Sequence, residues 1–259
     1  MEPKVKLEAK GIYKEFNEDN PITILKNINF VANHQEFVSF VGPSGCGKTT
    51  LFNIIAGLLE PTHGDIFIDG EKTTNTVSSQ IGYVLQKDLL LPWRTIEQNV
   101  ILGLEVKGVK KAEAKDRAIE YFKSYKLDGY QKKYPGELSG GMKQRVALMR
   151  TMIMEPEIIL MDEAYKALDY PLKIDLESEL LTTVKENKKT VIYITHDIEE
   201  AVTLSDRVYI MKARPGEIVK EMKIDLGVDS MRMNERRASK KFNDYYETIW
   251  QSIGAPKKE

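Results

Sequence analysis

The sequence is poor in three features, and each absence excludes a class of protein. Its 259 residues include a single cysteine, Cys46, so a disulfide framework is excluded and a reducing compartment is favoured. No apolar run approaches the roughly 18 residues that cross a bilayer, and the first residues lack the apolar core of a secretory signal. The 38 Lys and Arg residues are balanced by 39 Asp and Glu, which argues against nucleic acid as a partner.

A glycine-rich segment, residues 42–49, predicts nucleotide binding. It follows the apolar run 37–41 and precedes the apolar run 51–56, which predicts a strand, a loop and a helix in that order. The glycines let backbone N–H groups turn inward around phosphate, and the positive end of the helix faces the same anion. Lys48 is expected to reach the β- and γ-phosphates and Thr49 to bind Mg²⁺. The expected nucleotide-binding residues here are Gly42, Pro43, Ser44, Gly45, Cys46, Gly47, Lys48, Thr49 and Thr50.

A second segment of related chemistry lies about 110 residues further on. The apolar run 158–161 ends in two carboxylates, Asp162 and Glu163. In a P-loop enzyme this places Asp162 beside Mg²⁺ and positions Glu163 to polarise the attacking water. A buried strand that merely ends in acids is the alternative, but the phosphate loop upstream favours the catalytic interpretation.

A third segment, residues 138–145, predicts a second anion-binding helix terminus. Ser139, Gly140 and Gly141 precede a helix and are followed by Lys-Gln-Arg. A single site needs only one phosphate loop, so a second one makes sense if it caps a nucleotide held by another subunit. An N-capped helix after a flexible loop also describes the local structure, but it does not explain the composition.

With these motifs, residues 7–223 resemble the ATP-binding subunit of an ABC transporter. The resemblance implies an α/β fold: a P-loop NTPase of the ABC ATPase type, with an antiparallel β subdomain, a RecA-like parallel-sheet core and an inserted helical subdomain at about residues 92–150. We expect the ABC ATPase domain to cover residues 1–228, followed by a helical tail over residues 229–259. The tail carries aromatic and apolar side chains at helical spacing, at Phe242, Tyr246, Ile249 and Trp250.

The same resemblance implies roles for residues whose motifs are weaker. Gln86 matches the residue that touches Mg²⁺ and relays to the membrane subunit, and His196 matches the switch histidine at the γ-phosphate. Asp169 matches a residue of the dimer interface that borders the nucleotide. Phe16 is expected to stack on adenine, with Tyr13 as a nearby competitor. The residues expected to take part in catalysis are Glu163, His196, Lys48 and Gln86, and the expected Mg²⁺ contacts are Thr49, Gln86 and Asp162.

The sequence departs from the family pattern just after the acidic pair. Ala164 stands where a proline is usual, and Lys166 replaces a small residue. One hypothesis is that the Lys166 ammonium pairs with phosphate or with an acid across the dimer, and the alternative is a solvated lysine. A thiol in the phosphate loop, at Cys46, is expected to be protected from alkylation by ATP.

Two further segments narrow the resemblance to one group of importers. Residues 90–96 and 213–218 are similar to segments of importers for nitrate, sulfonates, taurine and thiamine precursors. The implied assembly is a homodimer that binds ATP and Mg²⁺ between Lys48 of one chain and Ser139 of the other. Two membrane-spanning permease subunits would hold it at the cytoplasmic face of the cell membrane, with an extracytoplasmic solute-binding protein as an indirect partner. A non-transport ABC ATPase and a nucleotide-gated regulatory subunit are the alternative functions.

Periodicity also predicts the ordinary secondary structure. Short strands are expected over residues 5–9, 22–25, 28–31, 66–68, 191–194, 208–211 and 217–223.

Overall fold

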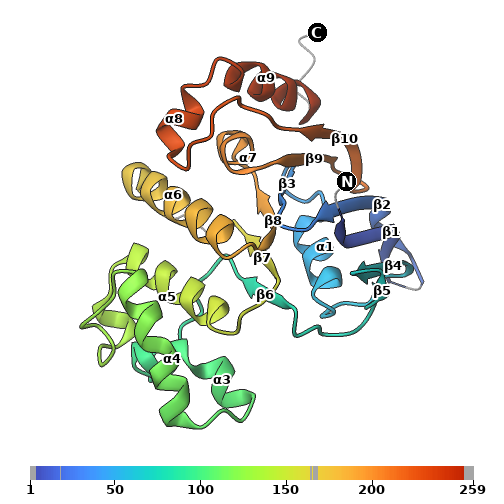
Figure 1. Cartoon of the computed structure of the whole chain (residues 1–259). Helices are drawn as coiled ribbons and strands as arrows, with labels where there is room; N and C mark the ends of the chain where they lie inside the picture. Colours follow the sequence, from blue (N-terminus) through green and yellow to red (C-terminus); the bar gives the residue numbers. More distant parts are fainter. Residues whose placement is uncertain (1–3, 18, 164, 166–168, 254–259) are drawn as a thin grey trace.

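The chain forms two β-sheets, of which the smaller is antiparallel and lies at one side of the molecule (Figure 1). The computed structural model describes residues 4–17, 19–163, 165 and 169–253 (Figure 1). The order of strands in the smaller sheet is β2-β1-β4-β5. Its strands are β1 (Val5–Phe16), β2 (Ile22–Asn33), β4 (His63–Ile68) and β5 (Glu71–Lys72).

The larger sheet is parallel except at one edge, and it carries the nucleotide-binding motifs. Its order is β10-β9-β3-β8-β7-β6, in which β10 alone pairs antiparallel. The strands β3, β7 and β8 are buried along their whole length, as expected for parallel strands covered on both faces. The strands are β3 (Phe37–Val41), β6 (Ile81–Val84), β7 (Ile158–Asp162), β8 (Thr190–Thr195), β9 (Arg207–Lys212) and β10 (Glu217–Lys223).

The first two strands are longer than the sequence predicts. The strand expected over 5–9 continues to Phe16, and the two strands expected over 22–31 are one. Their pairing shifts register at several points, and Asn27 takes the left-handed backbone conformation with φ of 49°. These irregularities interrupt the alternation of buried and exposed residues, so they read as strand ends in the sequence.

The helices fall into three groups in Figure 1. α1 packs between the two sheets, the helical insert lies to one side of both, and the C-terminal helices lie beside α7. The insert comprises α2 (Ile96–Val100), α3 (Leu102–Val106), α4 (Lys111–Ser124), the 3₁₀ turn η1 (Pro135–Glu137) and α5 (Gly140–Met152). The others are α1 (Lys48–Ile55), α6 (Tyr170–Glu186), α7 (Ile198–Leu204), α8 (Met233–Arg237) and α9 (Phe242–Ile253).

The parallel sheet has a buried core on each face. Val38 and Phe40 of β3 face α1 and the antiparallel sheet, where the Phe40 ring stacks on Tyr209 with centroids 5.2 Å apart. Val41 faces the opposite side, where α7 and α9 pack, and the fully buried Ile249 fixes α9 there. The amphipathic helix that the tail sequence predicts is therefore present. Among the described residues, no helix has both the length and the apolar character of a membrane span.

Candidate active site

The phosphate loop is the connection between β3 and α1, at the carboxyl edge of the parallel sheet. Gly45 and Gly47 have φ of 79° and 88°, a conformation that side chains rarely tolerate. A Cβ on Gly47 would also lie 2.5 Å from Leu25 Cδ2. Both glycines are therefore required by the backbone, and the loop surrounds a cavity of about 490 Å³. Its lining is Ile24, Ser44, Gly45, Cys46, Gly47, Lys48, Thr49, Thr50, Gln86, Asp162, Glu163 and Ile194.

Lys48 is held in place by the loop itself. Its Nζ donates hydrogen bonds to the carbonyl oxygens of Gly42 (2.7 Å) and Pro43 (3.1 Å). The residue is 8% exposed, so its ammonium is confined to the end of the cavity. A phosphate oxygen entering the cavity would meet a fixed positive charge that has already lost most of its water.

The side chain of Cys46 faces away from solvent, although its residue lines the cavity. Cys46 is fully buried in the core beneath the loop, among residues such as Leu51 and Phe52. Its Sγ lies 3.5 Å from Lys48 Nζ. The protection from alkylation that the sequence analysis expects from ATP is therefore already provided by burial.

The carboxyl end of β7 meets the start of α1. Thr49 Oγ1 donates a hydrogen bond to Asp162 Oδ2 over 3.2 Å. A hydroxyl and a carboxylate beside the cavity of the phosphate loop are ligands that Mg²⁺ accepts, so these residues fit the expected metal. Beneath them, burial and then the negative charge of Asp162 raise the pKa of Tyr83, whose hydroxyl stays protonated.

Glu163 lies between two other predicted residues. Its carboxylate accepts a hydrogen bond from Gln86 Nε2 (3.0 Å), and its other oxygen lies 2.9 Å from His196 Nδ1. The backbone of Glu163 is in the left-handed conformation, φ 43°, and its N–H donates to the carbonyl of Ile194. Three residues distant in sequence thus converge because β6, β7 and β8 are neighbours that end at one edge.

The residues of the second anion-binding segment lie outside this cavity. Ser139 caps α5 by accepting a hydrogen bond from the N–H of Met142 (3.4 Å). Ser139 and Gly140 are exposed, whereas Gly141 is buried and a Cβ there would lie 2.7 Å from Leu172 Cδ2. Close packing of α5 on α6 therefore requires a glycine at 141, while the helix terminus remains open to another molecule.

The remaining predicted residues lie on the surface or outside the described part of the chain. Phe16 ends β1, is 42% exposed and lies under the Lys14 ammonium, 4.8 Å from the ring centre. Its competitor Tyr13 makes an edge contact with His63 instead. Asp169 is exposed just before α6. The departures at 164 and 166 fall outside the described residues.

Two residues that no sequence motif indicates, Asn99 and Arg150, shape the segment after Gln86. Arg150, near the end of α5, donates hydrogen bonds to the carbonyl oxygens of Asp88 (2.6 Å) and Leu89 (2.9 Å). The fully buried Asn99 exchanges hydrogen bonds with both backbone groups of Leu91, at 2.7 and 3.1 Å. Neither has a sequence signal beyond a common residue type, because their partners are backbone groups.

A phosphate loop after β3, together with an acid-ended strand, β7, in the same parallel sheet, defines a P-loop nucleotide hydrolase. Comparison with known proteins makes this more specific. The family described as ABC transporter matches residues 25–166. The aliphatic sulfonates import ATP-binding protein SsuB of Bacillus cereus is 42% identical over 83% of this chain and 85% of its own length. The nitrate import ATP-binding protein NrtD of Synechocystis is 43% identical over 80% of this chain and 78% of its own.

Solved structures agree with the sequence relatives. A dimeric post-hydrolysis state of the ATP-binding cassette MJ0796, bound to ADP and Pi, superposes with a TM-score of 0.74 at 35% identity. The match covers 85% of this chain and 99% of that one. The chain therefore belongs to the ABC transporter family, as its ATP-binding ATPase subunit. The fold class that the sequence predicts is confirmed.

Proposed function

We propose that this ATPase subunit drives a membrane importer for a small solute of the nitrate, sulfonate, taurine or pyrimidine class. The observation that carries the catalytic part is the Glu163 carboxylate, which lies between Gln86 and His196 at the cavity of the phosphate loop. The solute class is supported by relatives described as sulfonate and nitrate importers. The chain itself offers no solute site in this proposal, because the permease and a solute-binding protein would select the solute.

In this mechanism each residue acts through the position described above. Lys48 exchanges its carbonyl partners for phosphate oxygens and balances the charge that develops as the bond to the γ-phosphate breaks. Glu163 orients and polarises the attacking water, and His196 donates a hydrogen bond to the γ-phosphate. Thr49, Asp162 and Gln86 would hold Mg²⁺, which neutralises phosphate charge when bound.

The exposed terminus of α5 supports a dimer in which each site is shared. Ser139 and Gly140 lie outside the cavity of their own chain and are accessible to another. In the proposed homodimer they bind the nucleotide that Lys48 of the partner holds, and Asp169 borders the same interface. Phe16 would stack on the adenine, since it is exposed at the end of β1.

The segment after Gln86 supports docking to a permease. Trp93 is 72% exposed and Leu89 is 52% exposed. Exposing such large apolar side chains to water is unfavourable, so a partner that covers them is expected. Asn99 and Arg150 fix the backbone of this segment, and Gln86 connects it to Glu163. In the proposed homodimer, one permease subunit binds this segment of each chain at the cytoplasmic face of the membrane. Hydrolysis of the nucleotide would change the position of Gln86 and, through it, of the bound permease.

The proposal is tested by isolating the complex in its ATP-bound state. Glu163→Gln should slow ATP hydrolysis by about 100-fold or more, because the base that polarises water is lost. It should accumulate as an ATP-bound dimer, and tagged protein in mild detergent should then co-purify with a polytopic membrane protein. Glu120→Gln, at an exposed position on α4, is the matched control. A normal rate in the Glu163 variant would overturn the catalytic assignment, and recovery of soluble partners alone would favour a non-transport ATPase.

A further inference from the structure

Next to His196, a buried ion cluster joins α6 to α7. Lys173 Nζ lies 2.6 Å from Asp197 Oδ2, 2.5 Å from Glu200 Oε1 and 3.8 Å from Glu177 Oε1. Glu177 and Glu200 are almost fully buried. Burial alone would raise the pKa of Asp197, but the hydrogen bond and charge of Lys173 outweigh burial and lower it. The Lys173 ammonium is therefore held mainly by carboxyl oxygens of these side chains.

The cluster holds the residues on both sides of His196. Asp197 caps α7, accepting hydrogen bonds from the N–H groups of Glu199 (2.9 Å) and Glu200 (3.3 Å). Thr195 donates its hydroxyl hydrogen to Glu200 and accepts a hydrogen bond from the N–H of Asp197. A small cavity of about 170 Å³ is lined by Glu163, Lys173, Thr195, His196, Asp197 and Glu200. A change in the cluster would therefore change the position or the surroundings of the His196 imidazole.

The C-terminal segment contributes a second cation to this cluster. Arg237 of α8 is only 12% exposed, and its guanidinium approaches Glu177 Oε2 (3.4 Å) and Glu199 Oε2 (3.7 Å). It also donates a hydrogen bond to the hydroxyl of Tyr170 (2.6 Å) and lies over that ring, 5.3 Å from its centre. Tyr170 begins α6, directly after Asp169. Arg237 therefore contacts the first turns of both helices that flank the cluster.

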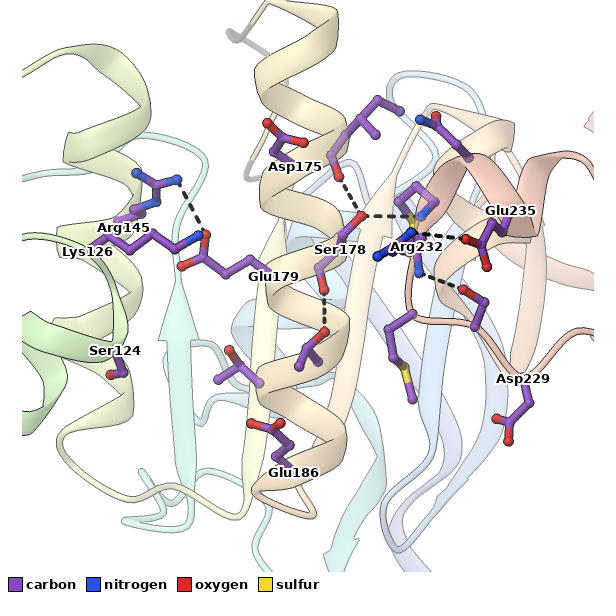
Figure 2. Close-up of a pocket in the computed structure, with 17 residues that line it drawn as sticks. Ser124, Lys126, Arg145, Asp175, Ser178, Glu179, Glu186, Asp229, Arg232 and Glu235 are labelled. Atoms are coloured by element: carbon purple, nitrogen blue, oxygen red, sulfur yellow. Dashed lines mark hydrogen bonds and ion pairs between the residues drawn. The ribbon is translucent and has the colours of Figure 1, made fainter.

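Other contacts fix α8 in this position. Figure 2 shows the segment at 229–235 against α6, where the N–H of Met233 donates to Ser178 Oγ over 3.2 Å. Met233 is fully buried, and Arg236 donates a hydrogen bond to the carbonyl of Thr203 in α7. Figure 2 shows α6 between this segment and α5, and all three line a cavity of about 980 Å³. The packing of α8 on α6 and α7 therefore fixes the position of Arg237.

We propose that Arg237 is a positioning residue of the ATPase site, which holds α7 and His196 in register with Glu163 through the buried ion cluster. Without Arg237, the guanidinium link that joins Tyr170 and Glu177 of α6 to Glu199 of α7 would be lost. With that link gone, α7 would be held less firmly against α6, and its cap at Asp197 would loosen. The inference rests on the proposed role of His196 at the γ-phosphate.

The first test is independent of activity. The chain has three histidines, His34, His63 and His196, so their imidazole NMR signals can be assigned by substitution. Arg237→Met should shift the signals of His196 in nucleotide-free protein and leave the other two unchanged. Arg232→Met is the matched control, because Arg232 is an exposed arginine of the same segment whose side chain contacts Glu235. Unchanged His196 signals in folded Arg237→Met would overturn the inference.

The second test is ATP turnover. Arg237→Met should lower kcat by about tenfold with KM for ATP changed less than about twofold, since alignment is lost and the phosphate loop is intact. Arg237→Lys should recover part of that loss. If Arg237→Met does not fold, Arg237→Lys and Tyr170→Phe carry the same test, with smaller shifts of His196 expected in both. An unchanged kcat in folded Arg237→Met, or in both other variants where Arg237→Met does not fold, overturns the inference.

A His196→Ala variant separates this inference from the proposed function. It should lose activity whatever occupies position 237. A wild-type rate in His196→Ala would overturn the proposed role of His196, and the catalytic meaning of the cluster with it. A shifted His196 signal with an unchanged rate in Arg237→Met would overturn the inference while leaving the proposed function standing.

Discussion

At the scale of single residues, several side chains in and near the site are buried although their type is usually exposed or reactive. Cys46 lies in a phosphate loop but is sealed in the core, and Glu177 is an acid in a fully buried position. Lys48, Glu163 and Gln86 could be predicted from the sequence because each stands in a recognisable motif. Lys173 and the cluster around it could not, because its partners come from separate helices and are common residue types.

Burial of the Cys46 thiol predicts slow alkylation in native protein, with or without ATP. A reagent must wait for the loop to open, so the rate should be at least about 100-fold below that of an unfolded control. Mass spectrometry after N-ethylmaleimide treatment measures it without ambiguity, because the chain has one cysteine. A Cys46→Ser, Val106→Cys protein, with its thiol at an 81% exposed position, should react at once. Equal rates in the two proteins would show that the loop is open.

The pKa of Glu177 predicts how stability changes with pH. Burial, followed by the charge of Glu200, raises this pKa from 4.5 to about 8. Between these values the folded chain keeps a proton that the unfolded chain has lost, so the free energy of unfolding should fall as pH rises from 5 to 8. The slope from this group is at most about 1.4 kcal/mol per pH unit. Denaturant titrations should show Glu177→Gln with a flatter profile than wild type, and parallel profiles would contradict the assignment.

At the scale of elements, each functional segment is fixed by a neighbour that sequence patterns do not identify. The order of the parallel strands brings Gln86, Glu163 and His196 to one edge, and the roles of Gln86 and His196 were predictable through the resemblance to ABC transporter subunits. The bulges in β1 and β2 were not predictable, because irregular pairing breaks the two-residue period on which strand assignment depends. The hydrogen bonds from Arg150 and Asn99 to the docking segment, the residues just after Gln86, were also not predictable. Their partners are backbone groups, which leave no pattern in the sequence.

Substitutions at Asn99 and Trp93 should distinguish the stability of the docking segment from its binding to the permease. Asn99→Ala leaves several buried backbone groups of this segment without partners, so it should cost about 2–4 kcal/mol of stability and weaken permease capture. Trp93→Ala removes an exposed side chain, so it should keep the stability of wild type while permease capture falls. Thermal unfolding and co-purification measure the two effects. Full capture by Trp93→Ala would place the docking surface elsewhere.

At the scale of the whole molecule, one chain holds half of each proposed site. Its own cavity contains Lys48 and Glu163, whereas Ser139 faces outward on α5. In a dimer with two-fold symmetry, each chain would complete the site of the other. A single chain cannot display that arrangement, so the sequence indicates the shared site through the presence of a second anion-binding terminus.

Purified heterodimers test the sharing directly. A Lys48→Ala chain paired with a Ser139→Glu chain should keep one intact site and about half of wild-type turnover. A chain with both changes paired with a wild-type chain should have two damaged sites and little activity. Two affinity tags, one on each chain, allow both pairs to be isolated and their phosphate release compared. If Ser139 serves the nucleotide of its own chain, the order of the two activities reverses.

The position of β3 in its sheet also governs when the site can form during synthesis. Both of its neighbours, β8 and β9, leave the ribosome about 150 residues later, an interval on the order of ten seconds. Until then the nascent strand has two open edges and an uncovered apolar surface, which is the kind of segment that chaperones protect. Ribosome-bound chains that end before residue 188 should therefore show no protection by ATP against proteolysis, and chains extended past β9 should gain it. The first motif to be translated would be among the last to bind its ligand.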